Sequence, residues 1–213
     1  LFPSPCICCG YLGEILCSRC FYKLQFEPHL REIDGMKICT AMYFEENSIL
    51  EKLIYSFKYE HYAEIYKIFV PYMKKSLELL TDLNGLVLVP VPLHKKRELD
   101  RGYNQSYLIA KAVSKALGFE VLNLLERVKN TESQAQTKSM EDRRNNIKDA
   151  FSVNGIMPKN RQIVLVDDIV TTASTIIECK NALNRSGATN VIALTLASRE
   201  KNNSGDRRFE KRR

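Results

Sequence analysis

Apolar residues follow one another without interruption in two short runs, 86–89 and 163–166. Such runs predict strands that are buried on both faces, as in a sheet covered by helices. After each run, apolar residues recur at helical spacing, over 109–117 and 176–183. The alternation of strand and helix predicts an α/β domain.

Weaker patterns predict the remaining elements. Apolar periodicity indicates strands or helices at 37–45 (strand), 48–58 and 63–80 (helices), 120–128 (strand or short helix), 150–153 (edge strand) and 190–197 (last strand). The aromatic residues around Lys58-Tyr59 and in 63–80 are interpreted as core rather than as a surface for stacking bases. The polar run 127–138 lacks periodicity and predicts a long mobile loop, a frequent form of active-site lid.

A chain of 213 residues, of which 45% are hydrophobic and 27% charged, can form one sizeable domain with a small appendage. No apolar run approaches the length of a membrane span, so we expect no transmembrane segment. Cysteines interrupt the N-terminus where a signal peptide needs an apolar core. These features predict a cytoplasmic protein.

The net charge of +7 is concentrated at the C-terminus, where residues 199–213 carry seven Lys or Arg against three Asp or Glu. The polar tail 200–213 is predicted to be disordered. It is either a nucleic-acid-binding arm or an addition made for expression, and the sequence leaves both open. The positive body suits phosphate ligands or weak nucleic-acid contacts, although basic runs are commonly solvated faces.

Seven cysteines include two CxxC pairs, Cys6 with Cys9 and Cys17 with Cys20. Four thiolates in tetrahedral geometry favour Zn²⁺, and a closed site of this kind is structural. A disulfide pair or scattered buried thiols are the alternatives, and a cytosolic location disfavours disulfides. Residues 1–27 are therefore predicted to form a four-cysteine zinc finger, with Cys8 as a bystander. Metal would supply folding energy to so small a unit.

Two carboxylates, Asp167 and Asp168, close the strand that begins at 163, and small hydroxyl residues follow before the next helix. Backbone amides at a helix N-terminus favour a phosphate. The carboxylates would repel that phosphate and suit sugar hydroxyls or Mg²⁺. A ribose 5-phosphate suits both the acidic pair, through its hydroxyls, and the helix N-terminus, through its phosphate. The alternative, a solvated acidic turn before an ordinary capped helix, explains the aspartates alone.

The stretch 163–175 resembles the phosphoribosyl pyrophosphate (PRPP) loop of type I phosphoribosyltransferases. Ala173 departs from that pattern, which usually has glycine there, and alanine favours the ordinary backbone regions. A second loop, 94–106, is basic and follows the strand at 86–89. Its Arg101 and Gly102 suit a pyrophosphate, because arginine binds phosphate oxygens bidentately and glycine lets the backbone approach. A solvated basic loop is the alternative.

The order of these parts resembles the ComF family of bacterial competence proteins. The resemblance covers roughly residues 6–199 and is carried by the four cysteines, 57–59, 89–93, 101–105, Thr131 with Gln134, Arg143 with Asn146, 150–151 and 163–175. It implies a type I phosphoribosyltransferase fold, with a mainly parallel sheet and helices on both faces. Residues 28–199 would form this domain, as a hood over about 28–82 and a core over about 83–199.

The same resemblance implies residue roles. Asp167 and Asp168 would hold ribose hydroxyls, and Arg101 with Gly102 would hold pyrophosphate. The 5-phosphate would lie on the run Thr171, Thr172, Ala173, Ser174 and Thr175, and Mg²⁺ would accompany PRPP. Lys129 and Gln134 would lie on the mobile loop as catalytic candidates.

The resemblance also implies a role in natural transformation, with single-stranded DNA handled on the cytoplasmic side of the inner membrane beside other competence proteins. Two hypotheses therefore stand. In the first, the chain binds PRPP and handles DNA. In the second, it is an active phosphoribosyltransferase of nucleobase salvage. The cysteine cluster and the basic tail favour the first hypothesis.

Overall fold

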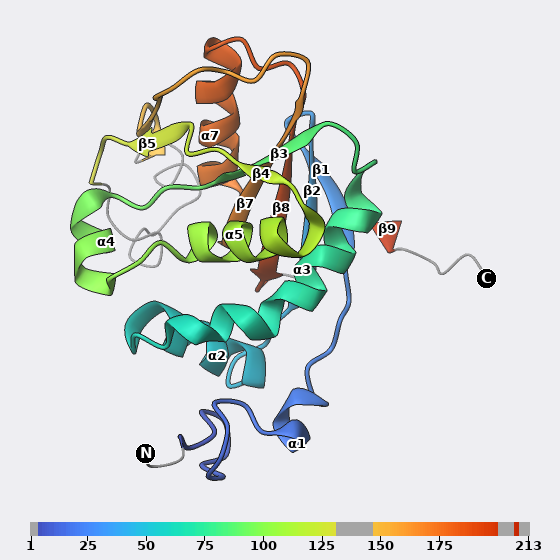
Figure 1. The fold of residues 1–213 in the computed structure, drawn as a ribbon, viewed down its shortest axis with the longest axis vertical. Helices are drawn as coiled ribbons and strands as arrows, with labels where there is room; N and C mark the ends of the chain where they lie inside the picture. The colour runs from blue at the N-terminus through green and yellow to red at the C-terminus, as the bar shows by residue number, and fades with distance from the viewer. Residues whose placement is uncertain (1–3, 131–146, 200–206, 209–213) are drawn as a thin grey trace.

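The computed structural model describes residues 4–130, 147–199 and 207–208. In these residues seven strands form one sheet, in the order β4-β3-β7-β8-β2-β1-β9 (Figure 1). The strands are β1 (His29–Ile33), β2 (Met36–Tyr43), β3 (Leu86–Pro90), β4 (Glu120–Val121), β7 (Gln162–Val170), β8 (Val191–Ser198) and β9 (Arg207–Arg208). Neighbours from β4 to β2 are parallel, whereas β1 and β9 are antiparallel. The predicted mainly parallel sheet is confirmed.

Helices cover both faces of this sheet, as expected. The helices are α1 (Ser18–Phe21), α2 (Ile49–Tyr59), α3 (Tyr66–Leu80), α4 (Lys95–Arg101), α5 (Gln105–Leu117) and α7 (Ser174–Arg185), with a 3-10 turn at Ala63–Ile65. Alternate residues of β7 enter two different cores. Val164 and Val166 pack with α2, α3 and α5, whereas Ile163 and Leu165 pack with α7. This alternation fits the period of two along a strand.

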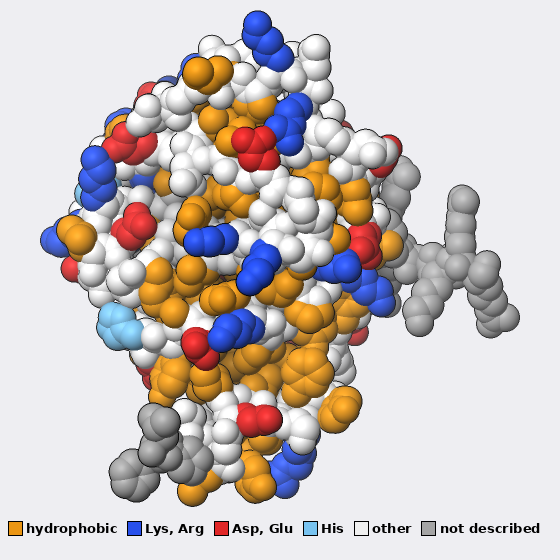
Figure 2. Space-filling view, in the orientation of Figure 1, with side chains coloured by type: hydrophobic (Ala, Val, Ile, Leu, Met, Phe, Trp, Pro, Cys, Tyr) orange, Lys and Arg blue, Asp and Glu red, His pale blue; other side chains and the backbone are white. Residues whose placement is uncertain are grey.

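The N-terminal segment forms a small unit at the opposite end of the molecule from α7 (Figure 1). Its buried side chains Cys6, Leu16, Cys17 and Cys20 join the core that contains α2 and α3. Figure 2 shows hydrophobic side chains gathered on this end of the molecule. The unit therefore packs on α2 and α3 and does not stand apart from the domain.

The connections after β3 and β7 run in opposite directions. After β3 the chain passes through α5 to β4, on one side, and after β7 it passes through α7 to β8, on the other. Because β3 and β7 are neighbours, the crevice at their carboxyl ends is a topological switch point. Ligands of open α/β sheets bind at such points.

The structure corrects the predicted end of the strand at 163–166. β7 continues through the aspartates to Val170, and Asp167 is in register with Thr195 of β8. The neighbouring strand β8 supplies ladder partners that far, so the carboxylates lie within the strand. The expected basic loop likewise contains a short helix, α4, whose N-cap is His94.

The structure adds detail or differs from the expectation in further elements. β1 was not predicted, because its sequence mixes polar and apolar residues, and it forms a hairpin with β2. Arg207 and Arg208 of the tail pair with β1 as β9, since an edge strand offers unpaired backbone groups. β5 (Leu125–Arg127) and β6 (Phe151–Val153) pair in a separate two-stranded sheet.

Some predictions lie outside the described residues, namely the loop at 131–138 with Thr131 and Gln134, the pair Arg143 and Asn146, and most of the tail 200–213. Among the described residues, no helix combines the length and apolar character needed to cross a bilayer.

Candidate functional site

A cavity of about 910 Å³ lies at the carboxyl ends of β3 and β7. α2 forms one wall, and α4 with the start of α5 forms another. The acidic pair, Thr171 and Thr175 are among the other lining residues. A cavity of this size is typical of small-molecule sites. The two loops that the sequence singled out, one basic and one acidic, therefore meet at one cleft.

Asp167 and Asp168 lie side by side in this cleft and are both nearly buried, at 9% and 7% exposed. Ser106 Oγ donates a hydrogen bond to Asp167 Oδ1 (2.9 Å), and the backbone N–H of Asp168 donates to the same oxygen (2.9 Å). The backbone N–H of Ile169 donates to Asp168 Oδ1 (2.6 Å). The carboxylates are therefore held in fixed orientations.

The electrostatics of the pair favour a ligand that supplies positive charge or hydroxyl donors. Burial raises the pKa of Asp167 to about 7, and the charge of Asp168 acts in the same direction, although Lys58 and Ser106 oppose it. Two adjacent carboxyls in a partly dry site resist double ionisation. A bound Mg²⁺ or a set of ribose hydroxyls would relieve that cost.

Lys58 is a site residue to which the sequence analysis assigned no role. Its Nζ lies 2.9 Å from Asp168 Oδ2, with the two side chains 18% and 11% exposed. The side chain reaches the cleft because Leu53 and Phe57 turn the other face of α2 into the core. The stretch 57–59 carried part of the family resemblance. The sequence feature that could have identified Lys58 is its position directly after Phe57, on the edge of the apolar stripe of α2.

The loop after β7 brings its residues to the cleft unequally. Thr171 and Thr175 line the cavity, whereas the hydroxyls of Thr172 and Ser174 contact each other at 2.9 Å. Ala173 is the N-cap of α7 and has φ 59° and ψ 4°. This left-handed conformation contradicts the expectation of an ordinary backbone region. It explains why glycine is usual here, since the conformation costs roughly 1–2 kcal/mol for other residues.

Arg101 ends α4, and Gly102 follows it with φ 83°, a left-handed C-cap that suits glycine. Arg101 Nη1 donates to Gln105 Oε1 (2.6 Å), and Arg101 lines the cavity. Gly102 is not one of the lining residues. Asn104 caps α5 and donates through Nδ2 to Val91 O (3.0 Å), which ties the basic loop to the end of β3.

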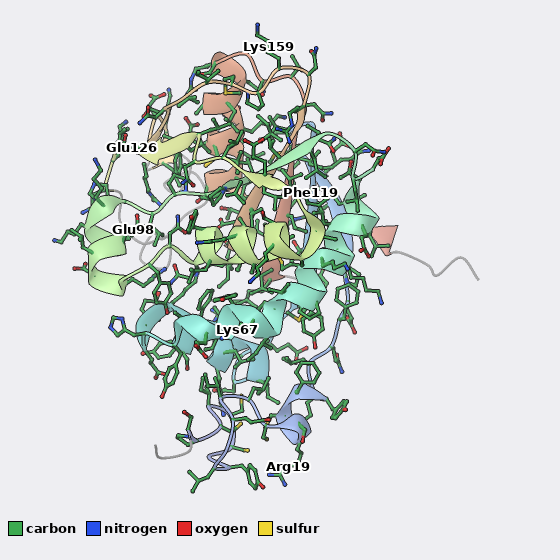
Figure 3. The ribbon with its side chains drawn as sticks, viewed as in Figure 1. Arg19, Lys67, Glu98, Phe119, Glu126 and Lys159 are labelled. Carbon is green, nitrogen blue, oxygen red and sulfur yellow. The ribbon has the colours of Figure 1, made fainter. Side chains whose placement is uncertain are left out.

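Polar contacts fix the position of α4 and of the start of α5. The Tyr103 hydroxyl and Gln105 Nε2 both donate to Phe57 O, at 2.8 and 3.0 Å. On the other side, Lys95 of α4 forms an ion pair of 2.9 Å with Glu126 of β5. Figure 3 places Glu126 on the same side of the molecule as α4. The basic wall of the cleft is thus anchored at both ends.

The structure does not place Lys129 in the cleft. Its exposed Nζ donates to Lys148 O (2.8 Å), and it is not a lining residue. Gln134 lies outside the described residues. Arg127, two positions earlier, does line the cavity and is 8% exposed, with its guanidinium 5.4 Å from the Phe151 ring centroid. Arg199 also lines it and pairs with Glu51. The sequence analysis gave neither arginine a role.

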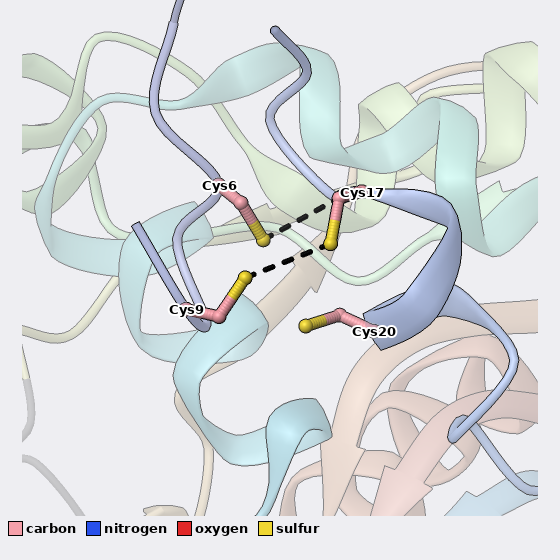
Figure 4. A group of neighbouring side chains, drawn as sticks. All are labelled: Cys6, Cys9, Cys17 and Cys20. Carbon is pink, nitrogen blue, oxygen red and sulfur yellow. Dashed lines mark hydrogen bonds between the residues drawn. The ribbon is translucent and has the colours of Figure 1, made fainter. Parts of the chain in front are cut away.

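The four predicted metal ligands come together in the N-terminal unit (Figure 4). The sulfur atoms of Cys6, Cys9, Cys17 and Cys20 all lie within 4.8 Å of one another. Cys9 Sγ and Cys17 Sγ are 3.6 Å apart, close to the ~3.8 Å expected between thiolates at 2.3 Å from a tetrahedral Zn²⁺. The expected alternatives of a disulfide or scattered thiols do not fit, because all seven cysteines are free and these four cluster.

The thiols of the cluster differ in their pKa values. Burial raises the pKa of the Cys6 thiol, but the N–H groups of Cys17, Cys8 and Cys9 donate to it and bring the pKa to about 6. Burial raises the pKa of the Cys20 thiol to about 12. Cys8 does not belong to the cluster, and burial raises its pKa to about 11. The donor set therefore fits a closed metal site such as a structural zinc site, with Cys8 as a bystander.

Comparison with known proteins agrees with this architecture. A model of the phosphoribosyl transferase domain matches residues 104–212. Competence protein F of Haemophilus influenzae is 32% identical over 204 residues, which cover 89% of this chain and 83% of that protein. The chain belongs to the ComF family. Competence protein ComFC of Streptococcus pneumoniae is 27% identical, over 87% of this chain and 81% of that protein. DNA utilization protein YhgH of Salmonella typhimurium is 31% identical, over 88% of this chain and 81% of that protein.

The ComF assignment made from the ordered motifs is thereby confirmed, together with the phosphoribosyltransferase domain. The matched domain begins at Asn104, which caps α5, and it includes the acidic pair and the loop 171–175. Its relatives are proteins of competence and DNA utilization.

Proposed function

We propose that this ComF protein binds PRPP with Mg²⁺ in the cleft and handles single-stranded DNA during natural transformation, on the cytoplasmic side of the inner membrane. The observation that carries the proposal is the nearly buried pair Asp167 and Asp168 beside the N-terminus of α7, at the switch point of the sheet. An acidic pair and an anion-favouring helix end, side by side, match the two ends of a ribose 5-phosphate.

In this proposal each wall of the cleft takes one part of PRPP. Asp167 and Asp168 accept hydrogen bonds from ribose hydroxyls, and Thr171 with Thr175 hold the 5-phosphate. Arg101 holds the pyrophosphate, and Gly102 ends α4 beside it. Mg²⁺ would neutralise the pyrophosphate charge when bound. Zn²⁺ on the four cysteines fixes the N-terminal unit.

The DNA part of the proposal is supported by the relatives named for competence and DNA utilization and by the net charge of +7. Basic residues that neutralise phosphates release counterions, so affinity for a single strand should fall with salt, at a log–log slope of roughly −0.7 per phosphate contacted. Arg97 in the cleft wall and the basic tail 200–213 are candidate contributors. Other competence proteins at the inner membrane are candidate partners.

Active phosphoribosyl transfer for nucleobase salvage is the second candidate. The acidic pair and a cavity of about 910 Å³ favour it, because that volume accommodates both PRPP and a base. Departure of pyrophosphate from the ribose would require stabilisation of the developing charge by the basic wall. Release of pyrophosphate from PRPP in the presence of a free nucleobase would support this candidate.

Titration with PRPP and with labelled single-stranded DNA, separately and in competition, tests the proposal. We expect Mg²⁺-dependent PRPP binding and salt-dependent DNA binding without strong sequence preference. Deletion of 200–213 should flatten the salt slope if the tail is an arm, and binding by the body should remain. Absence of DNA binding at low salt, with the zinc site loaded, would remove DNA as a direct partner and favour the salvage enzyme.

A further inference from the structure

Two exposed tyrosines stand one helical turn apart on the cleft side of α2. Tyr55 is 55% and Tyr59 60% exposed, and their ring centroids are 5.1 Å apart. Both rings line the cavity that contains the acidic pair. The sequence analysis interpreted the aromatic residues here as core. That interpretation is wrong for Tyr59, because the core face of α2 is formed by other residues, among them Leu53 and Phe57.

Two arginines of α4, Arg97 and Arg101, line the same cavity as the tyrosines. The guanidinium carbon of Arg101 lies 5.4 Å from the Tyr59 ring centroid. Burial lowers the pKa of Arg97, and the nearby charge of Arg101 lowers it further, so the two guanidinium groups repel each other. A phosphate near Arg97 would relieve this repulsion. Exposed aromatic rings beside an anion site form the pattern by which proteins hold single-stranded nucleic acids.

A second cavity lies on the other side of α2 from the first. It has a volume of about 570 Å³, lies between α2 and the N-terminal unit, and shares the lining residues Glu51 and Tyr55 with the first cavity. Tyr55 therefore lines both cavities. A free base would occupy one cavity only, whereas a strand held at Tyr55 has further nucleotides beside the second.

We propose that Tyr55 and Tyr59 stack a nucleobase carried by single-stranded DNA, with an adjoining phosphate beside Arg97. This inference rests on the proposed function, since it assigns the DNA partner to the mouth of the PRPP cleft. Stacking is tolerant of sequence, because every base has a π-face. The DNA base and PRPP then occupy neighbouring parts of one cleft, with Arg101 left to the pyrophosphate.

Fluorescence anisotropy with a short labelled oligothymidine tests the assignment, with an abasic oligomer of equal length and free thymine as separate ligands. The variants are Tyr55→Ala/Tyr59→Ala and Tyr55→Phe/Tyr59→Phe. Tyr11→Ala/Tyr22→Ala is the matched control, because those tyrosines are 67% and 84% exposed but belong to the N-terminal unit. Since all four rings are largely exposed, the fold should survive each change.

The alanine variant should lose about 5- to 150-fold in affinity for oligothymidine per stacked base. Its affinity for the abasic oligomer should not change, and the phenylalanine and control variants should bind as the parent does. Equal losses for both oligomers, or no loss, would overturn the proposal. If free thymine binds as tightly as oligothymidine, and if this binding also needs the two tyrosines, then the base at this site does not have to come from a DNA strand. That result would overturn the proposal.

PRPP calorimetry on the same proteins separates this inference from the proposed function. The phenylalanine variant should bind PRPP as the parent does, because it keeps the ring beside Arg101. A parent that fails to bind PRPP would contradict the proposed function, while the difference between the two oligomers would still decide the stacking site.

Discussion

Lys58 of α2 and Asp168 of β7 form an ion pair across the cleft, with Nζ 2.9 Å from Oδ2. The pair joins the wall that carries Tyr55 and Tyr59 to the strand that carries the acidic pair. A ligand that occupies Asp168 through hydroxyls or Mg²⁺ competes with Lys58 for the same carboxylate. The ion pair therefore couples the position of α2 to the occupancy of the site.

Lys58→Met should lower the free energy of unfolding by about 1.5–3 kcal/mol, because it leaves a nearly buried carboxylate without its cation. Lys58→Arg should lose less, since the charge is kept. Lys67→Met is the control, because Lys67 pairs with Glu64 at 59% and 67% exposure (Figure 3), and such surface pairs contribute about 0–1 kcal/mol. Equal losses in urea unfolding for both methionine variants would contradict a structural role of the ion pair.

The raised pKa of Asp167 predicts a pH dependence of stability. Below its ordinary value of 3.8 the carboxyl is protonated in both states, and as pH rises to about 7 the unfolded chain releases its proton first. Asp167 should therefore reduce the unfolding free energy as pH rises across this window, by up to about 1.4 kcal/mol per pH unit. Above about pH 7 the effect is constant.

Urea unfolding of the parent and of Asp167→Asn from pH 5 to pH 8 measures this effect, because titrating groups remote from Asp167 contribute equally to both proteins. The variant should become progressively more stable than the parent as pH rises to about 7. A stability difference that does not change with pH would show that the buried carboxyl titrates normally.

The cysteine cluster predicts one zinc ion per chain. Metal analysis of purified protein should find it in the parent and in Cys8→Ser, whose thiol lies outside the cluster. Cys17→Ser/Cys20→Ser should lose the metal, and the N-terminal unit should unfold, because it has little core of its own. Zinc retained by the double variant would refute the ligand assignment.

The left-handed backbone of Ala173 predicts that replacement by glycine lowers stability only slightly. Ala173 and Ala182 are both 3% exposed, but Ala173 has φ 59°, whereas Ala182 lies inside α7. Ala182→Gly should lose the buried methyl group and about 1 kcal/mol of helix propensity. Ala173→Gly loses a similar methyl group but releases left-handed strain, so it should cost at least about 1 kcal/mol less. Equal costs in thermal or urea unfolding would contradict this account.

Sequence reasoning succeeded where a local pattern determines the structure. The apolar runs at 86–89 and 163–166 identified the two strands that flank the cleft, because doubly buried strands need such runs. The CxxC spacing likewise identified four sulfurs that lie within 4.8 Å of one another.

It failed where a distant segment determines the outcome. Pairing with β8 extends β7 past Asp167, and the cleft places Lys58 on Asp168 from a helix more than a hundred residues away. The positive φ of Ala173 could not be predicted from the sequence, because alanine by itself prefers negative φ. Tyr59 is exposed because it lies off the apolar stripe of α2, whose Leu53 and Phe57 face the core.

Calorimetric titration with PRPP in the presence of Mg²⁺ tests the central claim most directly, on the parent and on Asp167→Asn/Asp168→Asn. Glu64→Gln/Glu120→Gln is the control, since it removes the same charge at exposed positions. Charged hydrogen bonds are worth about 1.5–3 kcal/mol each, so the aspartate variant should bind at least about tenfold more weakly, and the control should bind as the parent does. Equal PRPP affinity in the parent and the folded aspartate variant would contradict the assignment of the cleft.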